Sequence, residues 1–330
     1  MTPAQFKQKG GLAKPAFLMH PLIHMMIVLR WLVISLLTGL VLHGQSVQVD
    51  TPRMLLLSAT LAGQNVIAVG ERGTILRSDN EGLNWQGIPS PTTATLTAVK
   101  FSQDGLQGWA VGHAALIIAT DNGGASWQTV YQGENLEDSF LDLCVVDEHT
   151  IIAIGAYGQC VRSLDGGKTW QPHMVQDDDS HLNQITADPD GTLYIAGERG
   201  TLLCSHDLGE TWVPIPALYE GSFYGVLPLG DSALLAYGLR GHIYRSLDNG
   251  DSWKAVPIPS KPLLATACRL DDGQIVLAGQ SRAFLLSKDA GVTFEAWPQN
   301  LTTGVAYLLQ TPSGRLLAFG EGGVASLDQP

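Results

Sequence analysis

One sequence unit recurs seven times along the chain. Each copy has an apolar run that ends in Gly, then a short turn, then a second apolar run. Six of the copies continue into an eight-residue segment that ends in Trp or Phe. A period of this length indicates one supersecondary unit repeated in space, which decides the fold before any local assignment. The glycine that ends the first run recurs every 41 to 43 residues, at Gly70, Gly112, Gly155, Gly197, Gly238, Gly279 and Gly320.

Each copy predicts a small antiparallel sheet. Short apolar runs separated by Gly and Asp turns, four to a copy, are typical of a four-stranded meander. One such sheet cannot bury both of its faces alone, so copies are expected to stack radially as the blades of a propeller. The expected fold is therefore all-β, a seven-bladed β-propeller of four-stranded antiparallel blades over residues 45–330. Seven copies fill this length and leave no room for an inserted catalytic domain.

The seventh copy is incomplete. Its sequence, LLAFGEGGVASLD, reaches the end of the chain at Pro330 before an eight-residue segment can form. An outer strand is then missing from the last blade, and an unpaired edge invites association with other chains. Ser46 to Asp50, with alternating Val47 and Val49, is predicted to complete the last blade.

Residues 1–44 have the character of a targeting segment. They hold four basic and no acidic residues, and the apolar run Trp31–Leu42 precedes the small residues Gly44 and Ser46. This order predicts a cleaved secretory signal. The alternative is a retained membrane anchor over Leu22–Leu42, with Arg30 near its middle at a cost of about 2.5–3.5 kcal/mol. Both place a signal or anchor helix before the propeller and predict export.

Charge and cysteine content narrow the function. Beyond residue 44 there are 15 basic and 31 acidic side chains, a formal net charge of −16. Nucleic-acid binding needs a large basic face, so DNA and RNA are excluded as partners. No Cys pair has CxxC spacing, which excludes a zinc cage or a thioredoxin-like pair, and no metal or cofactor is expected. Four free and mostly buried thiols are predicted, at Cys144, Cys160, Cys204 and Cys268.

The eight-residue segments, called box turns below, resemble the Asp-box (BNR) repeat S-x-D-x-G-x-T-W between the third and fourth strands. Ser and Asp can bond turn amides, Gly supplies a positive φ, and the aromatic ring packs beside the sheet. Each box is therefore expected to stabilise the fold, and a single Asp per box is too few oxygens for calcium. The box residues are Ser78, Asn80, Trp85, Thr120, Asn122, Trp127, Ser163, Asp165, Trp170, Ser205, Asp207, Trp212, Ser246, Asp248, Trp253, Ser287, Asp289 and Phe294.

Two other function classes were weighed. Sialidases and related glycosidases also contain Asp boxes, but no Arg-Ile-Pro motif occurs here and no pair of convergent carboxyl groups is singled out. No catalytic residue is therefore assigned. The densest acidic group, Asp177 to Asp179 with His181, is predicted to be a solvated loop, with a cation site as the alternative. The remaining class is a propeller that binds a carbohydrate or small ligand in its central channel.

Arginine recurs at two positions of the repeat. The turn arginines lie in GxRG-like turns between the second and third strands, and the strand arginines lie just before the box serine. Equivalent repeat positions have the same height on a ring, so a basic arc suited to protein contact is predicted. The alternative is local pairing with carboxylates such as Glu71 and Glu198. The turn arginines are Arg72, Arg199, Arg240 and Arg282, and the strand arginines are Arg77, Arg162 and Arg245.

With its export segment, its G-E-R-G turns and its R-S-x-D-G-G-x-T-W boxes, the chain resembles the photosystem II stability and assembly factor family from about residue 50 to 328. The resemblance implies a seven-bladed propeller of the thylakoid lumen or bacterial periplasm that assists membrane-protein assembly without catalysis. It implies partner contact through an arginine patch. The matching positions are Arg72, Arg77, Arg162, Arg199, Arg240 and Arg245.

The chain departs from the family at two places. The lipidation Cys of cyanobacterial relatives is missing, and the first two boxes have Asn in place of Asp. We expect a non-enzymatic monomer whose partner is a membrane protein or envelope complex. Photosystem II subunits are the expected client in a photosynthetic host, and another client, such as a transporter, in any other host.

Overall fold

A computed structural model describes residues 47–48, 50–51, 54–216 and 218–330. The predicted leader over residues 1–44 lies outside these ranges. Within the described residues, no helix is long and apolar enough to cross a membrane.

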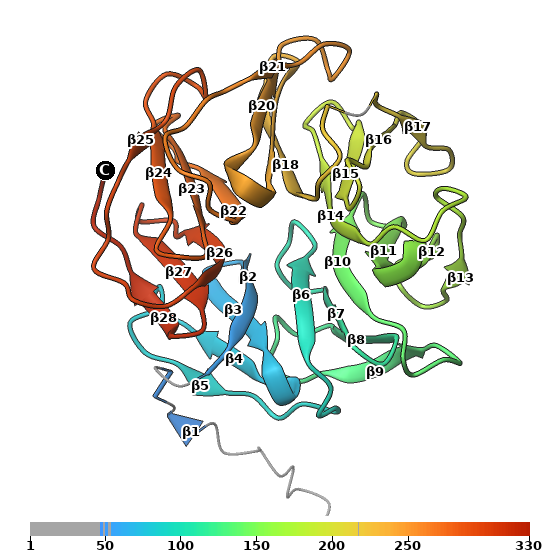
Figure 1. The fold of residues 1–330 in the computed structure, drawn as a ribbon. Coiled ribbons are helices and arrows are strands. Elements are labelled where there is room, and N and C mark those ends of the chain that lie inside the picture. The colour runs from blue at the N-terminus through green and yellow to red at the C-terminus, as the bar shows by residue number, and fades with distance from the viewer. Residues whose placement is uncertain (1–46, 49, 52–53, 217) are drawn as a thin grey trace, which may run out of the picture. The chain divides into compact units, whose positions relative to one another are not determined.

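Seven antiparallel sheets follow one another around a ring (Figure 1). Each sheet is built from consecutive strands of one repeat, so the chain completes one blade before it enters the next. The seven-bladed propeller predicted from the repeat is confirmed. Blades 2 to 6 have four strands, the first sheet has five, and the last has three.

The first strand of each blade lies innermost, around the channel. All seven have a register shift between their first and third residues, which is a β-bulge. A bulge inserts an unpaired residue and twists the strand, which here turns side chains into the channel. The first strands are β2 (Leu56–Ala62), β6 (Leu96–Phe101), β10 (Phe140–Val145), β14 (Leu182–Ala187), β18 (Phe223–Gly230), β22 (Leu264–Arg269) and β26 (Val305–Gln310).

The second strands form the core of each blade. Nearly every residue in them is buried, because neighbouring blades cover both faces of the sheet. Their continuous apolar sequence, without alternation, follows from this two-sided burial. The second strands are β3 (Asn65–Gly70), β7 (Gly108–Gly112), β11 (Ile151–Gly155), β15 (Leu193–Gly197), β19 (Ala233–Gly238), β23 (Ile275–Gly279) and β27 (Leu316–Gly320).

The third and fourth strands lie outermost and are joined by the box turns. The third strands are β4 (Ile75–Ser78), β8 (Leu116–Thr120), β12 (Cys160–Ser163), β16 (Leu202–Ser205), β20 (Ile243–Ser246), β24 (Phe284–Ser287) and β28 (Gly323–Ser326). The fourth strands are β5 (Gln86–Gly87), β9 (Gln128–Gln132), β13 (Gln171–Pro172), β17 (Val213–Pro214), β21 (Lys254–Ala255) and β25 (Glu295–Ala296).

The hydrophobic core lies between blades. Seven clusters of buried side chains occur, and each combines residues of two adjacent blades. One of them joins the last blade to the first, where Trp85 and Phe319 meet edge to face with ring centroids 6.0 Å apart. Burial of apolar surface on both faces of every sheet therefore stabilises the closed ring.

The predicted pairing of the amino-terminal strand with the last blade is wrong. The strand β1 (Val47–Gln48) pairs antiparallel with β5 of the first blade, Val47 opposite Gly87. The chain enters along the junction of the last and first blades, where the Thr51 carbonyl lies against Gly323. From there the outer edge of the first blade takes up β1, and the last blade keeps three strands.

Hydrogen bonds also connect the ends of the ring. Glu81, in the first box turn, accepts bonds from the Thr311 hydroxyl at 3.1 Å and the Ser313 amide at 3.2 Å, and it also bonds the Ser313 hydroxyl. These contacts join the first blade to the last through side chains and not through a shared strand.

Candidate binding face and central channel

The turns between second and third strands place one side chain per blade at the same end of the ring. In three blades the turn is a single 3-10 turn, η1 (Glu71–Gly73), η2 (Ala156–Gly158) and η3 (Leu239–Gly241). Its middle residue has a left-handed backbone, which points the side chain outward. Arg72, Tyr157, Arg199, Arg240 and Arg282 have this conformation, with φ between 54° and 61°.

The turn arginines are exposed, and three of them lie on the consecutive fourth, fifth and sixth blades. Arg72 is on the first blade and is separated from this group by the last blade. Arg199 pairs with Asp179 at 2.9 Å, and both side chains are exposed. An exposed pair of this kind contributes little to stability and leaves the arginine available to a partner.

The alternative of local pairing is seen for Arg199 and Arg162, which pair with Asp179 and Glu210. It is not seen for Glu71 and Glu198. Each instead accepts a backbone N–H just before the first strand of its own blade, from Leu55 and from His181, both at 3.3 Å. Glu321 does the same for Gly304 in the last blade. The Glu of the GERG motif therefore fixes the backbone at the start of the first strand, and the Arg side chain lies on the surface.

Aromatic and imidazole rings accompany the turn arginines. Tyr219 stacks on His242 with centroids 4.1 Å apart, and His242 is stacked in turn with Tyr244 at 6.1 Å. The exposed Tyr157 meets His181 edge to face at 4.8 Å. Arginines interspersed with rings are the composition of protein interfaces.

The strand arginines lie near the opposite end of the third strand and serve another purpose. Arg162 forms an ion pair with Glu210 in the box turn of the next blade. Arg245 donates to the Ala290 carbonyl, in the box turn of the next blade, at 2.8 Å. Arg77 is half-buried in β4. The structure thus separates the seven predicted arginines into two sets, of which only the turn arginines share one exposed face.

The box turns repeat one hydrogen-bond network. In the third blade, the Ser163 hydroxyl donates to Asp165 at 2.9 Å, and the Gly167 and Thr169 amides donate to Ser163 and Asp165 at 2.8 and 2.9 Å. The Trp170 indole donates to the Gly167 carbonyl at 3.1 Å. The bonds from Thr169 hold the pKa of Asp165 down at about 2. The same Ser-to-Asp, or Thr- or Ser-to-Asn, bond is present in the other boxes.

Other predicted candidates show ordinary surroundings. Asp177, Asp178 and Asp179 are exposed in the loop after β13. Asp178 accepts from Gln176 and from the Ser180 amide, which accounts for its position. Among the described residues, no group of three or more His, Cys, Asp or Glu side chains could hold a metal ion. Cys144 and Cys160 are buried and Cys204 and Cys268 half-buried, all as free thiols.

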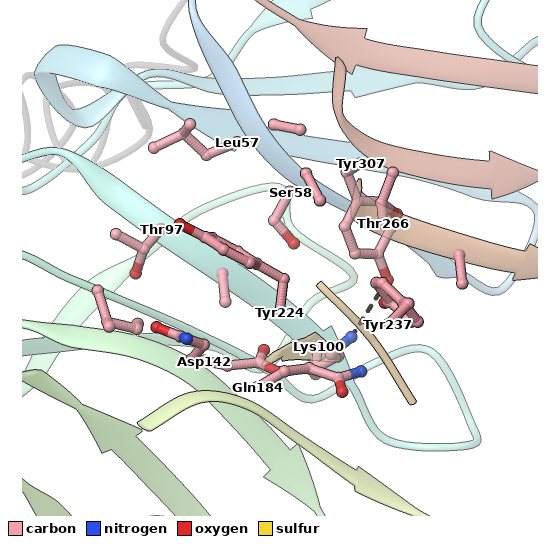
Figure 2. A pocket seen from close by; sticks show the side chains of 16 residues that line it. Leu57, Ser58, Thr97, Lys100, Asp142, Gln184, Tyr224, Tyr237, Thr266 and Tyr307 are labelled. Carbon is pink, nitrogen blue, oxygen red and sulfur yellow. Dashed lines mark hydrogen bonds between the residues drawn. The ribbon is translucent and has the colours of Figure 1, made fainter. Parts of the chain in front are cut away.

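The central channel contains a cavity of about 150 Å³ (Figure 2). All seven first strands line it, mainly with the bulge residue and the residue after it. The first residues of these strands pair with the glycines that precede the arginine turns. The bulge residues that line the cavity therefore lie near the same end of the ring as the turn arginines.

The residue after the bulge often forms a hydrogen bond to the neighbouring blade. In four blades its side-chain oxygen accepts the backbone N–H of the next first strand. These bonds run from Val99 to Ser58 at 3.3 Å, Ile185 to Asp142 at 3.0 Å, Val226 to Gln184 at 2.7 Å, and Leu308 to Thr266 at 3.2 Å. The channel wall is thus polar because its side chains satisfy backbone groups between blades.

Two charged groups line this cavity. The Lys100 ammonium donates to the Tyr307 hydroxyl at 3.2 Å, which joins the second blade to the seventh across the channel. Burial alone would lower the pKa of Lys100, but the oxygens of Tyr307 and Asp142 outweigh burial and raise the pKa above its usual value. Burial raises the pKa of Asp142, and Lys100 opposes that shift.

The sequence analysis missed this cluster. Its signal was available in the polar residues two positions after the start of five of the seven first strands, and in a lone Lys within LTAVKF. Nothing in one repeat indicates which of these side chains meet across the ring.

The comparisons with known proteins agree with the geometry. Residues 131–276 match the family model described as Photosynthesis system II assembly factor YCF48. The predicted resemblance to this family is confirmed. The matched stretch spans the third to fifth blades and the first strand of the sixth, and it includes the turn arginines Arg199 and Arg240. No curated protein sequence matches the chain.

Solved structures with the same fold include two YCF48 proteins. One, described as YCF48 bound to D1 peptide, has 20% identity and a TM-score of 0.70 and covers 87% of this chain and 96% of its own. YCF48 from Cyanidioschyzon merolae has 16% identity and a TM-score of 0.71, covering 86% and 98%. The WD40 propeller domain of Doa1 has 11% identity and a TM-score of 0.69, covering 86% and 96%. At these identities the structures establish the fold alone.

Proposed function

We propose that this protein is an exported, non-enzymatic propeller that binds a segment of a membrane protein and assists its assembly. The observation that carries the proposal is the match to the YCF48 family over blades whose turn arginines share one exposed face. A similar structure has a D1 peptide bound, which supports a membrane-protein client. We place the protein in the periplasm or thylakoid lumen, as expected from its leader.

The chemistry of the face fits a peptide that carries carboxylates. The turn arginines can form forked, bidentate pairs with carboxylates, and the Tyr219 and His242 rings offer stacking surface next to Arg240. Long-range attraction is limited by the acidic body, so contact close to the arginines has to supply the affinity. No observation favours a glycoside hydrolase. Among the described residues that line the cavity, Asp142 is the one Asp or Glu, whereas most retaining and inverting glycosidases use two carboxyl groups.

The test replaces the three turn arginines on consecutive blades, Arg199, Arg240 and Arg282, with Ala. We expect a D1 peptide, measured by fluorescence anisotropy, to bind at least about tenfold more weakly, because charge-assisted bonds are lost. Capture from solubilised membranes of the host, followed by mass spectrometry, should lose the same membrane proteins.

The matched control removes three exposed lysines elsewhere, Lys168, Lys254 and Lys288, and so changes the net charge equally. It should leave binding within about twofold of the unmodified protein if contact near the arginines dominates. Equal losses in both variants would mean that only net charge matters, and undiminished binding in the arginine variant would refute the proposed face.

A further inference from the structure

We propose that the central channel binds a small monocarboxylate, with the carboxylate held by the Lys100 ammonium beside the Tyr307 hydroxyl. This proposal goes beyond the client binding proposed above and does not depend on it. A small ligand in the channel would be recognised by other residues than the turn arginines.

The first argument is the unused capacity of Lys100. An ammonium group has three donors, and among the described residues Lys100 uses one, to Tyr307 at 3.2 Å. No carboxylate of the described chain lies within 4.0 Å of its nitrogen. Asp142 stabilises the ammonium group only from beyond 4.0 Å, and a charge inside a protein is costly unless it is paired, so an anion in direct contact with Lys100 would be favoured. The Lys100 side chain lines the cavity.

The second argument is size and lining. A volume of about 150 Å³ is that of a few water molecules, at about 30 Å³ each in the liquid. Hydroxyl groups of Thr97 and Thr266 lie in the wall together with apolar Leu57, Ala98 and Ala306. Such a wall suits a carboxylate with a tail of one or a few carbon atoms.

The third argument is charge selection by Asp142. It is buried, with its one bond to a neighbouring blade made to the Ile185 amide. As the second charged group of the cavity it repels anions, which disfavours phosphate and dicarboxylates relative to a single negative charge. A monocarboxylate is therefore the class of ligand that Lys100 can bind with the least repulsion from Asp142.

Tyr237 closes the far side of the cavity. It belongs to a second strand, and its hydroxyl reaches the channel past Gly225, where a Cβ atom would overlap it. Gly225 takes the position that holds a bonding side chain in four other blades, and the Tyr237 hydroxyl lies near Lys100 and Tyr307. The hydroxyl can donate to an anion held there.

The experiment is isothermal titration calorimetry of the purified full-length protein with sodium acetate and sodium propionate. Acetamide serves as the uncharged isostere of acetate, and sodium chloride tests for an adventitious small anion. We expect acetate and propionate to bind and acetamide not to bind. Binding of acetamide or chloride as tight as that of acetate, or no binding of either carboxylate, would overturn the assignment.

Two substitutions locate the site. Lys100→Gln should weaken acetate binding at least about tenfold, whereas Lys254→Gln, on the outer strand β21, should leave it unchanged. Asp142→Asn keeps an oxygen for the Ile185 amide and removes the negative charge, so acetate should bind more tightly. The result for Asp142→Asn tests the site even if Lys100→Gln fails to fold. Weaker binding in Asp142→Asn would contradict the proposed charge selection.

Discussion

At the scale of single residues, the box turns show which atoms of a repeated motif matter. Asn80 and Asn122 stand where other blades have Asp, yet their side-chain oxygens accept the same amide bonds, from Asn84 at 2.9 Å and Ser126 at 3.0 Å. The Asn122 amide even donates to the Ser126 hydroxyl at 2.8 Å, in place of the bond that an Asp accepts. The requirement is therefore an oxygen acceptor at this position, and the negative charge is dispensable.

The negative charge of the box Asp residues does affect how the stability of the fold changes at low pH. The bonds made to Asp165, Asp207 and Asp289 hold the pKa of each at about 2, below its usual value. A carboxyl whose pKa is lower in the folded state stabilises the fold above its unfolded pKa, near 4, and loses that effect as pH falls through the folded pKa. We therefore expect the melting temperature to fall between about pH 4 and pH 2.

Replacing the three Asp residues with Asn should flatten this acid decline while changing the melting temperature at pH 7 only slightly. The measurement is the melting temperature from pH 7 to pH 2 by circular dichroism. The unmodified protein and the triple variant should diverge in their acid profiles, and superimposable profiles would contradict the role assigned to these carboxylates.

At the scale of elements, the prediction for the amino-terminal strand was right that a blade edge is paired but wrong about which blade. An open edge of the last blade does need cover, but the first blade also has an open outer edge, and the sequence pattern of residues 46–50 fits either. The path by which the chain enters the ring determines which blade β1 pairs with. Thr51 lies against Gly323, and the next available edge is β5. The ring is closed by packing at the junction of the last and first blades.

Removing β1 should therefore cost little. A chain that begins at Asp50 loses two residue pairs with β5, and we expect its melting temperature to lie within a few degrees of that of a chain beginning at Ser46. Phe319→Ala removes a fully buried ring from the junction and should cost about 3–5 kcal/mol in unfolding free energy by chemical denaturation. A larger loss from the deletion than from Phe319→Ala would restore the strand as the main closure.

At the scale of the whole molecule, stability is shared around the ring. Every core cluster belongs to two blades, so no blade has a core of its own. Removing one blade exposes apolar faces on both of its neighbours. The ring is thus a single cooperative unit, in contrast to an open array of repeats.

Ending the chain after residue 304 removes the last blade and tests whether the ring unfolds as one cooperative unit. The faces of the sixth and first blades lose their cover, so we expect aggregation in size-exclusion chromatography and loss of the single calorimetric transition. A chain ending at Leu327 retains all seven clusters and is the control. A monomeric product with one sharp transition after removal of the blade would refute cooperativity through ring closure.

The sequence alone determined the repeat unit, the number of blades and the places of the turns, because the same apolar runs and turn residues recur in every copy of about 42 residues. The hydrogen bonds of a box turn, for instance, join residues no more than four apart. Only the tertiary structure decided the pairing of β1, the contacts of the strand arginines with the next blade, and the meeting of Lys100 with Tyr307, 207 residues away. These depend on which side chains closure of the ring brings together, and a period common to all seven copies does not distinguish one copy from another.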